Sequence, residues 1–305
     1  MSSSAPPVSR LSARQRRDRS SAWLFMAPAV VALILVALWP LGKSISISFT
    51  DANFGSPGEA AFIGLRNYAD VFDDRVWWVA VGNTLQFTVV SVALETVLGL
   101  GIALLLNQAI PARGMLRAAI LIPWAMPVVV SAKIWEWMLH DQFGIANRLL
   151  RDAGFIERGI AFMSEPGLAL WIVIGIDVWI TTPFMVLLIL AGLQTIPREI
   201  EEAAVLDGIP AWRRLTGITL PLLRPAIGVA ILFRTLDALR MFDLSYVLGG
   251  NGLKTLTISI YARNQLVSYQ EIGLGSAAST LVFLIVAASA MVVILSLRLH
   301  RGTEV

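Results

Sequence analysis

Six apolar stretches of this chain are long enough to cross a lipid bilayer. The first, residues 22–41, contains 20 residues without a charge, and a helix of that length covers the roughly 30 Å of bilayer hydrocarbon. The sequence therefore predicts an all-α integral membrane protein with six transmembrane helices. The five further stretches are 84–106, 118–138, 167–193, 222–242 and 274–297.

The composition excludes several classes of soluble enzyme. Hydrophobic residues make up 56% of the 305 residues and charged residues only 15%, against about 25% charged in an ordinary soluble domain. The absence of cysteine excludes disulfides, cysteine-ligated metals and cysteine nucleophiles. The two histidines, His140 and His300, are too far apart in the sequence to indicate a local metal pair. We expect no metal, cofactor or nucleic-acid partner on this chain, and no nucleophile–base pair of an intramembrane enzyme.

The distribution of basic residues predicts the orientation in the membrane. If the six stretches are spans, the N-terminus and the loops on its side carry 13 Lys and Arg, and the longer alternate loops carry eight. Because cytoplasmic loops are enriched in Lys and Arg, both termini should be cytoplasmic. No small-residue cleavage site follows the first stretch, so it should be a retained helix rather than a secretory signal. The predicted organisation is a basic, disordered N-terminus over 1–21, one lipid-embedded domain over 22–297 and a cytoplasmic tail over 298–305.

The loop over 195–225 has the pattern of two short helices joined by a turn. Pro197 suits the first turn of a helix, and the acidic residues just after it complement the positive end of the helix dipole. Gly208 permits the left-handed backbone at a helix end, and Pro210 suits the start of a second helix. A rigid elbow of this kind, on the predicted cytoplasmic side, is suited to binding a partner protein.

The elbow also carries a recognisable motif. It reads Glu202-Ala203-Ala204-x-x-Asp207-Gly208, followed ten residues after Gly208 by Ile218-x-Leu220-Pro221-x-x-x-Pro225. This pattern resembles the EAA motif of binding-protein-dependent ATP-binding cassette (ABC) importer permeases. It departs from that motif at Ile209, where alanine is usual, and at Leu215, where an aromatic residue is common. Three further segments are similar to carbohydrate permeases of the maltose and trehalose type: Phe62-Ile63-Gly64-Leu65-x-Asn67-Tyr68, Ile122-Pro123-Trp124 and Phe233-Arg234-Thr235-Leu236-Asp237.

The resemblance implies the type I ABC importer permease fold and import of a di- or oligosaccharide such as trehalose or maltose. It implies a multi-pass subunit of the bacterial cytoplasmic (inner) membrane that forms a heterodimer with a second, homologous permease. The expected partners are also two copies of an ABC ATPase and an extracytoplasmic sugar-binding protein. ATP and Mg²⁺ should belong to the ATPase, because this chain has no Gly-rich phosphate-binding motif and should not be an enzyme. The residues expected to contact the ATPase are Glu202, Ala203, Ala204, Asp207, Gly208 and Leu215.

Polar side chains within the predicted spans are candidates for the transport path, because ionisable groups are costly in hydrocarbon unless they face protein or water. Residues at i, i+3, i+4 and i+7 share a helical face. Two such sets combine polar groups for sugar hydroxyls with apolar surface for sugar rings, and the resemblance places sugar contacts on the same two spans. The candidate sugar-binding residues are Asp177, Ile180, Thr181 and Phe184 in the fourth span, Arg234, Asp237, Ala238 and Met241 in the fifth, and Arg240 near the cavity mouth.

Two alternatives remain open for the charged residues. Arg234, Asp237 and Arg240 have the spacing of an internal ion-pair chain. Alternatively, the same architecture imports glycerol phosphate or a polyol, and the two arginines bind phosphate. The discriminating observation is whether these arginines face the cavity or pair with Asp237. Elsewhere, Glu95 should face another helix, and Lys133 and Glu136 are spaced to pair with each other.

Overall fold

The structure is helical over most of the residues it describes. This computed structural model describes residues 25–55, 60–108, 111–165, 167–249 and 252–299. The predictions for the N-terminus over 1–21 and for most of the tail over 298–305 concern residues outside these ranges. Within the described ranges, pairing of the β type is limited to an isolated bridge between Thr50 and Phe62.

Long apolar helices occupy the predicted spans. With a bent pair counted as one span, the described residues contain up to six, in agreement with the sequence. The spans that are not broken are Phe25–Ile47, which contains the π-helical turn η1 (Ile34–Leu38) and α2 (Trp39–Ile47); α4 (Arg75–Asn107); α8 (Ala169–Gln194); Ala211–Leu239, made of α10 (Ala211–Arg214), the π-helical turn η2 (Leu215–Thr219) and α11 (Leu220–Leu239); and α14 (Ile272–Leu299).

The third predicted span is broken rather than continuous. The stretch expected as one helix over 118–138 forms α5 (Arg113–Ala125) and α6 (Val128–Met138), which are bent by 88°. The cause is Pro127, which lacks a backbone N–H and disfavours helical backbone in the residue before it. Met126 accordingly has an extended conformation, with φ −81° and ψ 140°. Hydropathy continues across this break, so the apolar run alone did not reveal it.

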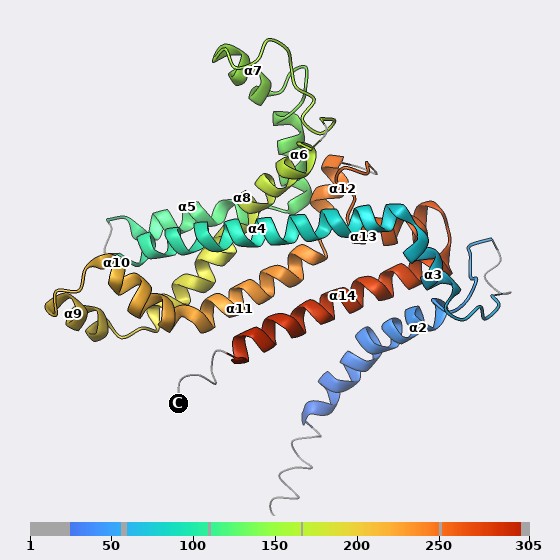
Figure 1. The fold of residues 1–305 in the computed structure, drawn as a ribbon, viewed down its shortest axis with the longest axis horizontal. Helices are drawn as coiled ribbons and strands as arrows, with labels where there is room; N and C mark the ends of the chain where they lie inside the picture. Colours follow the sequence, from blue (N-terminus) through green and yellow to red (C-terminus); the bar gives the residue numbers. More distant parts are fainter. Residues whose placement is uncertain (1–24, 56–59, 109–110, 166, 250–251, 300–305) are drawn as a thin grey trace, which may run out of the picture.

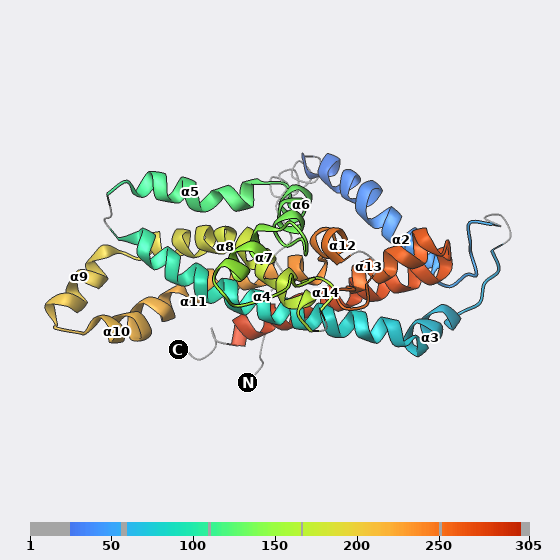
Figure 2. The ribbon, with the colours of Figure 1, turned by 90° about the horizontal axis from the view of Figure 1, so that it is seen from above.

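The short helices mark the two ends of the helical body. α9 (Arg198–Leu206) and α10 lie at one end with the adjoining ends of α4 and α5, whereas α3 (Arg66–Asp73) lies at the opposite end (Figures 1 and 2). The elbow and the connection between α4 and α5, which are predicted to share one side of the membrane, therefore lie at one end of the molecule, whereas α7 (Ile145–Asp152) projects from its middle (Figure 1). Which end faces the cytoplasm stays a prediction. The remaining short elements are α12 (Asp243–Gly249), α13 (Ile258–Arg263) and the π-helical turn η3 (Asn264–Ser268).

Helices α4, α8 and α11 pack closely around two glycines. A Cβ atom at Gly99 of α4 would lie 2.8 Å from the Cβ of Met185 on α8, and one at Gly192 of α8 would lie 2.4 Å from the Cβ of Ala226 on α11. Small residues allow membrane helices to approach at backbone distance, which increases the packing that holds such helices together. The three helices therefore form the centre of the molecule, and they position the polar groups described below.

This packing predicts that Gly99→Leu lowers the free energy of unfolding by about 1–3 kcal/mol, because the added side chain overlaps Met185. Gly101→Leu on the same helix is the matched control, since a Cβ there meets no atom within 4 Å. The temperature at which half of the detergent-purified protein aggregates measures the effect. Equal temperatures for the two variants would contradict the close packing of α4 against α8.

Candidate functional site

A single guanidinium group joins the three central helices. Arg234 on α11 donates from Nε to Glu95 Oε2 on α4 at 2.5 Å and from Nη2 to Glu95 Oε1 at 3.0 Å. Its Nη2 also donates to Asp177 Oδ2 on α8, and its Nη1 to Asp237 Oδ2 at 2.8 Å. The Arg234 side chain is 2% exposed and that of Glu95 is 0% exposed. Bidentate arginine–carboxylate pairs of this kind are among the stronger polar contacts in proteins.

Thr181 extends this network along α8. Its Oγ1 donates to Glu95 Oε1 at 2.7 Å, so Glu95 accepts hydrogen bonds from two different helices. A buried ion pair is stable only when its remaining hydrogen-bonding positions are also filled. The network of Glu95, Asp177, Thr181, Arg234 and Asp237 engages four of the five N–H groups of the arginine and links the three helices to one another.

The network forms one wall of a small polar cavity. The cavity has a volume of about 100 Å³. Asp237 remains open to it, with 68% of its side chain exposed. The lining residues are Val128, Asp177, Ile180, Thr181, Arg234, Asp237, Met241, Phe242, Asp243 and Leu244. Carboxylates thus outnumber basic groups around the cavity, and apolar side chains flank them.

Six of the nine predicted sugar-binding residues line this cavity: Asp177, Ile180, Thr181, Arg234, Asp237 and Met241. The other three lie elsewhere. Phe184 stacks on Trp124, with ring centroids 6.1 Å apart; Ala238 is fully buried in the apolar core; and Arg240 is exposed, with Nε donating to the Leu236 carbonyl at 3.2 Å.

The end of α11 differs from the predicted helical face. The sequence places Met241 on a helix continuing to residue 242, but α11 ends at Leu239 and α12 begins at Asp243. Met241 therefore reaches the cavity from the turn between two helices. Of the proposed ion-pair chain, the contact between Arg234 and Asp237 is present, whereas Arg240 makes its hydrogen bond to the backbone.

Glu95 is a central residue of the network, although it was predicted from the sequence only to face another helix. The available signal was an acidic residue in the middle of an apolar span, which requires a buried partner. Its partners, Arg234 and Thr181, lie 139 and 86 residues away in sequence, so local spacing did not reveal them. The predicted pair of Lys133 and Glu136 is confirmed at 2.6 Å.

The elbow over 195–225 contains the predicted first short helix and turn, but its second helix is not separate, because α10 continues through η2 into α11 as the span Ala211–Leu239. Gly208, between α9 and α10, has φ +70°, a left-handed conformation that glycine adopts without strain. The turn is closed by hydrogen bonds from Gly208 N to Val205 O and from Ile209 N to Ala204 O, both 3.0 Å. Glu202, Ala203, Asp207 and Gly208 are exposed, Ala204 is buried, and Leu215 is half-buried.

Among the large apolar side chains exposed on the elbow, Leu206 and Trp212 are the most exposed, and neither was predicted as a contact. Leu206 at the end of α9 is 87% exposed, and Trp212 on α10 is 72% exposed. Exposed aromatic and aliphatic groups on a projecting surface are typical anchors of protein interfaces. The sequence signal was present, because Leu206 occupies an unspecified position within the motif and Trp212 lies four residues after Gly208, but the motif itself is defined by other positions.

These features define a class of protein: a multi-pass helical membrane protein with a polar cavity between its spans and a rigid elbow at one end. Residues 95–302 match the family described as binding-protein-dependent transport system inner membrane component. The chain belongs to this family, and it is a permease subunit of an ABC sugar importer in the inner membrane. Its relatives are transport components rather than enzymes.

Individual relatives extend over most of the chain. It is 42% identical to a trehalose/maltose transport system permease protein of Thermococcus litoralis, over 88% of this chain and 91% of the relative. It is 40% identical to a sulfoquinovosyl glycerol transport system permease protein of Agrobacterium fabrum, over 87% and 86%. Among solved structures, the chain is similar to a chain of a bacterial ABC transporter involved in the import of the acidic polysaccharide alginate. The TM-score is 0.81 at 21% identity, and the match covers 95% of this chain and 100% of that one. This similarity supports the fold.

The ion network predicts a specific pattern of stability changes. Arg234→Met should lower the free energy of unfolding by about 3–5 kcal/mol, because it leaves the buried carboxylates of Glu95 and Asp177 without a counter-charge. Adding Glu95→Gln and Asp177→Asn should recover most of that loss. Arg240→Met, at an exposed site, should change it by less than about 0.5 kcal/mol. Thermal aggregation in detergent measures the stability of all three variants. If the uncharged triple variant does not regain most of the stability lost in Arg234→Met, the loss is not electrostatic in origin.

Proposed function

We propose that this chain forms half of the translocation path for an uncharged di- or oligosaccharide of the trehalose or maltose type. The observation that carries the proposal is the chemistry of the cavity. Asp237 and Thr181 offer oxygen atoms for sugar hydroxyls, and Met241 and Phe242 offer apolar surface for the sugar ring. The trehalose/maltose permease of Thermococcus litoralis, at 42% identity, supports the same substrate class.

The alternative of glycerol phosphate fits the cavity less well. Arg234, the one basic residue among those lining the cavity, donates to three carboxylates. The carboxylates of Asp177, Asp237 and Asp243 would repel a phosphate, and Arg240 does not line the cavity. A polyol is uncharged and would not be repelled by these carboxylates. However, it has no ring face to pack against the apolar side chains of the cavity.

The size of the cavity favours a two-subunit path. Ligand pockets in proteins are commonly about 300–1,000 Å³, whereas this cavity is about 100 Å³. One chain therefore encloses too little space for a disaccharide, and we propose that a second, homologous permease supplies the remaining wall. An extracytoplasmic binding protein, as the family description implies, delivers the sugar.

We propose that the elbow of this chain contacts one of two ABC ATPase subunits. The second ATPase subunit would contact the second permease. Glu202, Ala203, Asp207 and Gly208 present the motif surface, and Leu206 and Trp212 are proposed as apolar anchors beside it. ATP and Mg²⁺ would bind to the ATPase, whose closure would move the elbow and the central helices with it. The packing of α8 against α11 at Gly192 gives this movement a direct connection to the cavity.

The substrate assignment predicts the behaviour of the importer reconstituted in liposomes with its ATPase, second permease and binding protein. Labelled trehalose or maltose should accumulate with ATP, and Asp237→Ala should reduce the initial rate by about tenfold, the loss expected for one hydrogen bond to a charged group. Lys133→Gln, remote from the cavity lining, is the control. Preferential uptake of glycerol phosphate would contradict the assignment.

The coupling assignment predicts that Leu206→Ser combined with Trp212→Ala removes at least nine-tenths of the co-purifying ATPase, because both anchors are exposed in the isolated chain. Phe155→Ser is the matched control, since Phe155 is an equally exposed apolar residue outside the elbow. Quantitative mass spectrometry of the purified complex gives the ratio of ATPase to this chain. An unchanged ratio in the double variant would overturn the role of these anchors.

A further inference from the structure

Phe242 is the one aromatic side chain among the described residues that line the cavity. It lies in the turn between α11, which ends at Leu239, and α12, which begins at Asp243. The backbone of this turn is held by Thr257, whose Oγ1 donates to the carbonyl of Met241 at 2.9 Å. Because no helix includes Phe242, the position of its ring depends on its side-chain contacts.

The ring of Phe242 stacks on the ring of Tyr246, which lies four residues later in α12. The two ring centroids are 5.1 Å apart, and the ring planes are inclined by 16°. Stacked aromatic rings stabilise one another beyond the area that they bury. The hydroxyl of Tyr246 makes no hydrogen bond to a described residue. Tyr246 therefore supports Phe242 with its ring and not with its hydroxyl.

Arg263, the last residue of α13, in turn holds Tyr246. Its guanidinium carbon Cζ lies 5.1 Å from the centroid of the Tyr246 ring, within the roughly 6 Å of a cation–π contact. Its Nη1 donates to Ser268 Oγ at 2.9 Å and to Asn264 Oδ1 at 3.3 Å, so the guanidinium is itself fixed by η3. We call Phe242, Tyr246 and Arg263 the aromatic column. It leads from the cavity to α13, which lies on the side of α12 nearer to α3 (Figures 1 and 2).

The aromatic column and the polar wall of the cavity are held by different parts of the fold. Phe242 and Tyr246 pack against an apolar cluster that includes Trp77 of α4 and Tyr261 of α13. The polar wall is held instead by the contacts of Arg234 with carboxylates of α4, α8 and α11. Substitutions in the aromatic column should therefore leave the ion network in place.

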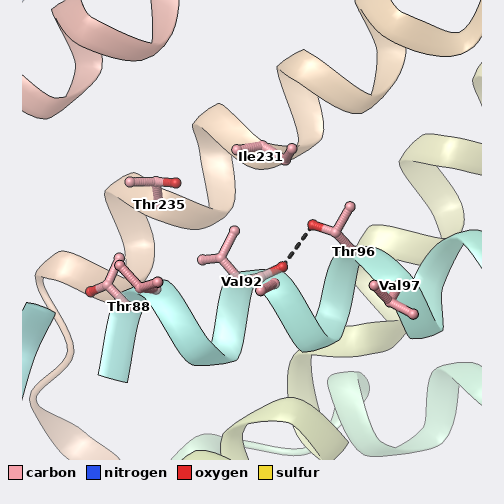
Figure 3. Close-up of a pocket in the computed structure, with 8 residues that line it drawn as sticks. Thr88, Val92, Thr96, Val97, Ile231 and Thr235 are labelled. Atoms are coloured by element: carbon pink, nitrogen blue, oxygen red, sulfur yellow. Dashed lines mark hydrogen bonds between the residues drawn. The ribbon is translucent and has the colours of Figure 1, made fainter. Parts of the chain in front are cut away.

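The larger apolar groove between α4 and α11 offers no comparable surface. It has a volume of about 450 Å³, and the described residues that line it are aliphatic residues and threonines (Figure 3). The hydroxyl of Thr96 in this groove already donates to the carbonyl of Val92, at 2.6 Å (Figure 3). Because the described lining of the groove contains neither an aromatic ring nor a carboxylate, the combination that suits a sugar belongs to the cavity.

We propose that Tyr246 and Arg263 are positioning residues that hold the ring of Phe242 as a stacking surface for a pyranose ring of the transported sugar. The apolar C–H face of a pyranose packs against an aromatic ring, and it does so best when the ring is already fixed, since less freedom is then lost on binding. This inference rests on the proposed function, which supplies the sugar. It adds the two residues, remote from the polar wall, that determine how firmly the cavity holds the sugar.

The number of sugar molecules imported per ATP hydrolysed tests the proposal in the reconstituted importer. Tyr246→Leu, which removes the stacked ring, should lower this ratio about fivefold, because sugar that is not held in the cavity returns to its side of origin while ATP hydrolysis continues. Tyr246→Phe should keep the ratio. Arg263→Met should lower it about threefold, the effect of one partly exposed cation–π contact. Phe72→Leu is the matched control, since Phe72 of α3 packs on Trp78 outside the cavity lining.

The ratio separates positioning from a merely structural role. A variant that folds or assembles poorly lowers sugar uptake and ATP hydrolysis together and leaves the ratio unchanged. An unchanged ratio in Tyr246→Leu would overturn the proposal, and so would a ratio in Tyr246→Phe as low as in Tyr246→Leu. If Tyr246→Leu does not assemble with its partners, Arg263→Met decides in the same way. If the unaltered importer takes up neither trehalose nor maltose, the proposed function itself fails.

Discussion

The contact between Arg234 and its carboxylates is the constraint on which the rest of this membrane domain depends. Apolar packing alone leaves helices in a bilayer free to slide or rotate at little cost, because lipid chains are as apolar as leucine. A buried guanidinium that must satisfy Glu95 on one helix and Asp177 on another allows one register only. The close approaches at Gly99 and Gly192 then hold the three helices at that register.

The same contact determines the character of the cavity. Because the guanidinium of Arg234 is paired with carboxylates, it holds the helices that line the cavity together and would present no unpaired positive charge to a substrate. Asp237 both contributes to the network and remains open to the cavity. Under the proposed function, a site of this kind would suit the hydroxyl groups of a sugar and would connect substrate recognition with the packing of α8 and α11. Under the proposed function, movement of these helices would alter the cavity.

Local chemistry made much of this architecture predictable from sequence. The length of the apolar stretches predicted the spans, Gly208 and its flanking prolines predicted the elbow, and polar residues at helical spacing predicted six cavity residues. The remaining features depended on tertiary structure or on a local break within an apolar stretch. Pro127 bends the third span without interrupting its hydropathy. Met241 lies beyond the end of α11, and Phe184 stacks on Trp124 instead of lining the cavity. The partners of Glu95 come from helices distant in the sequence.

The decisive measurement is a cryo-electron microscopy structure of the complete importer in a lipid nanodisc, with sugar trapped in the translocation path. We predict that the sugar contacts Asp237, Thr181 and Met241 while the guanidinium of Arg234 stays within hydrogen-bonding distance of Glu95 and Asp177. A sugar bound away from this cavity, or an Arg234 that leaves Glu95 to bind the substrate, would contradict this prediction.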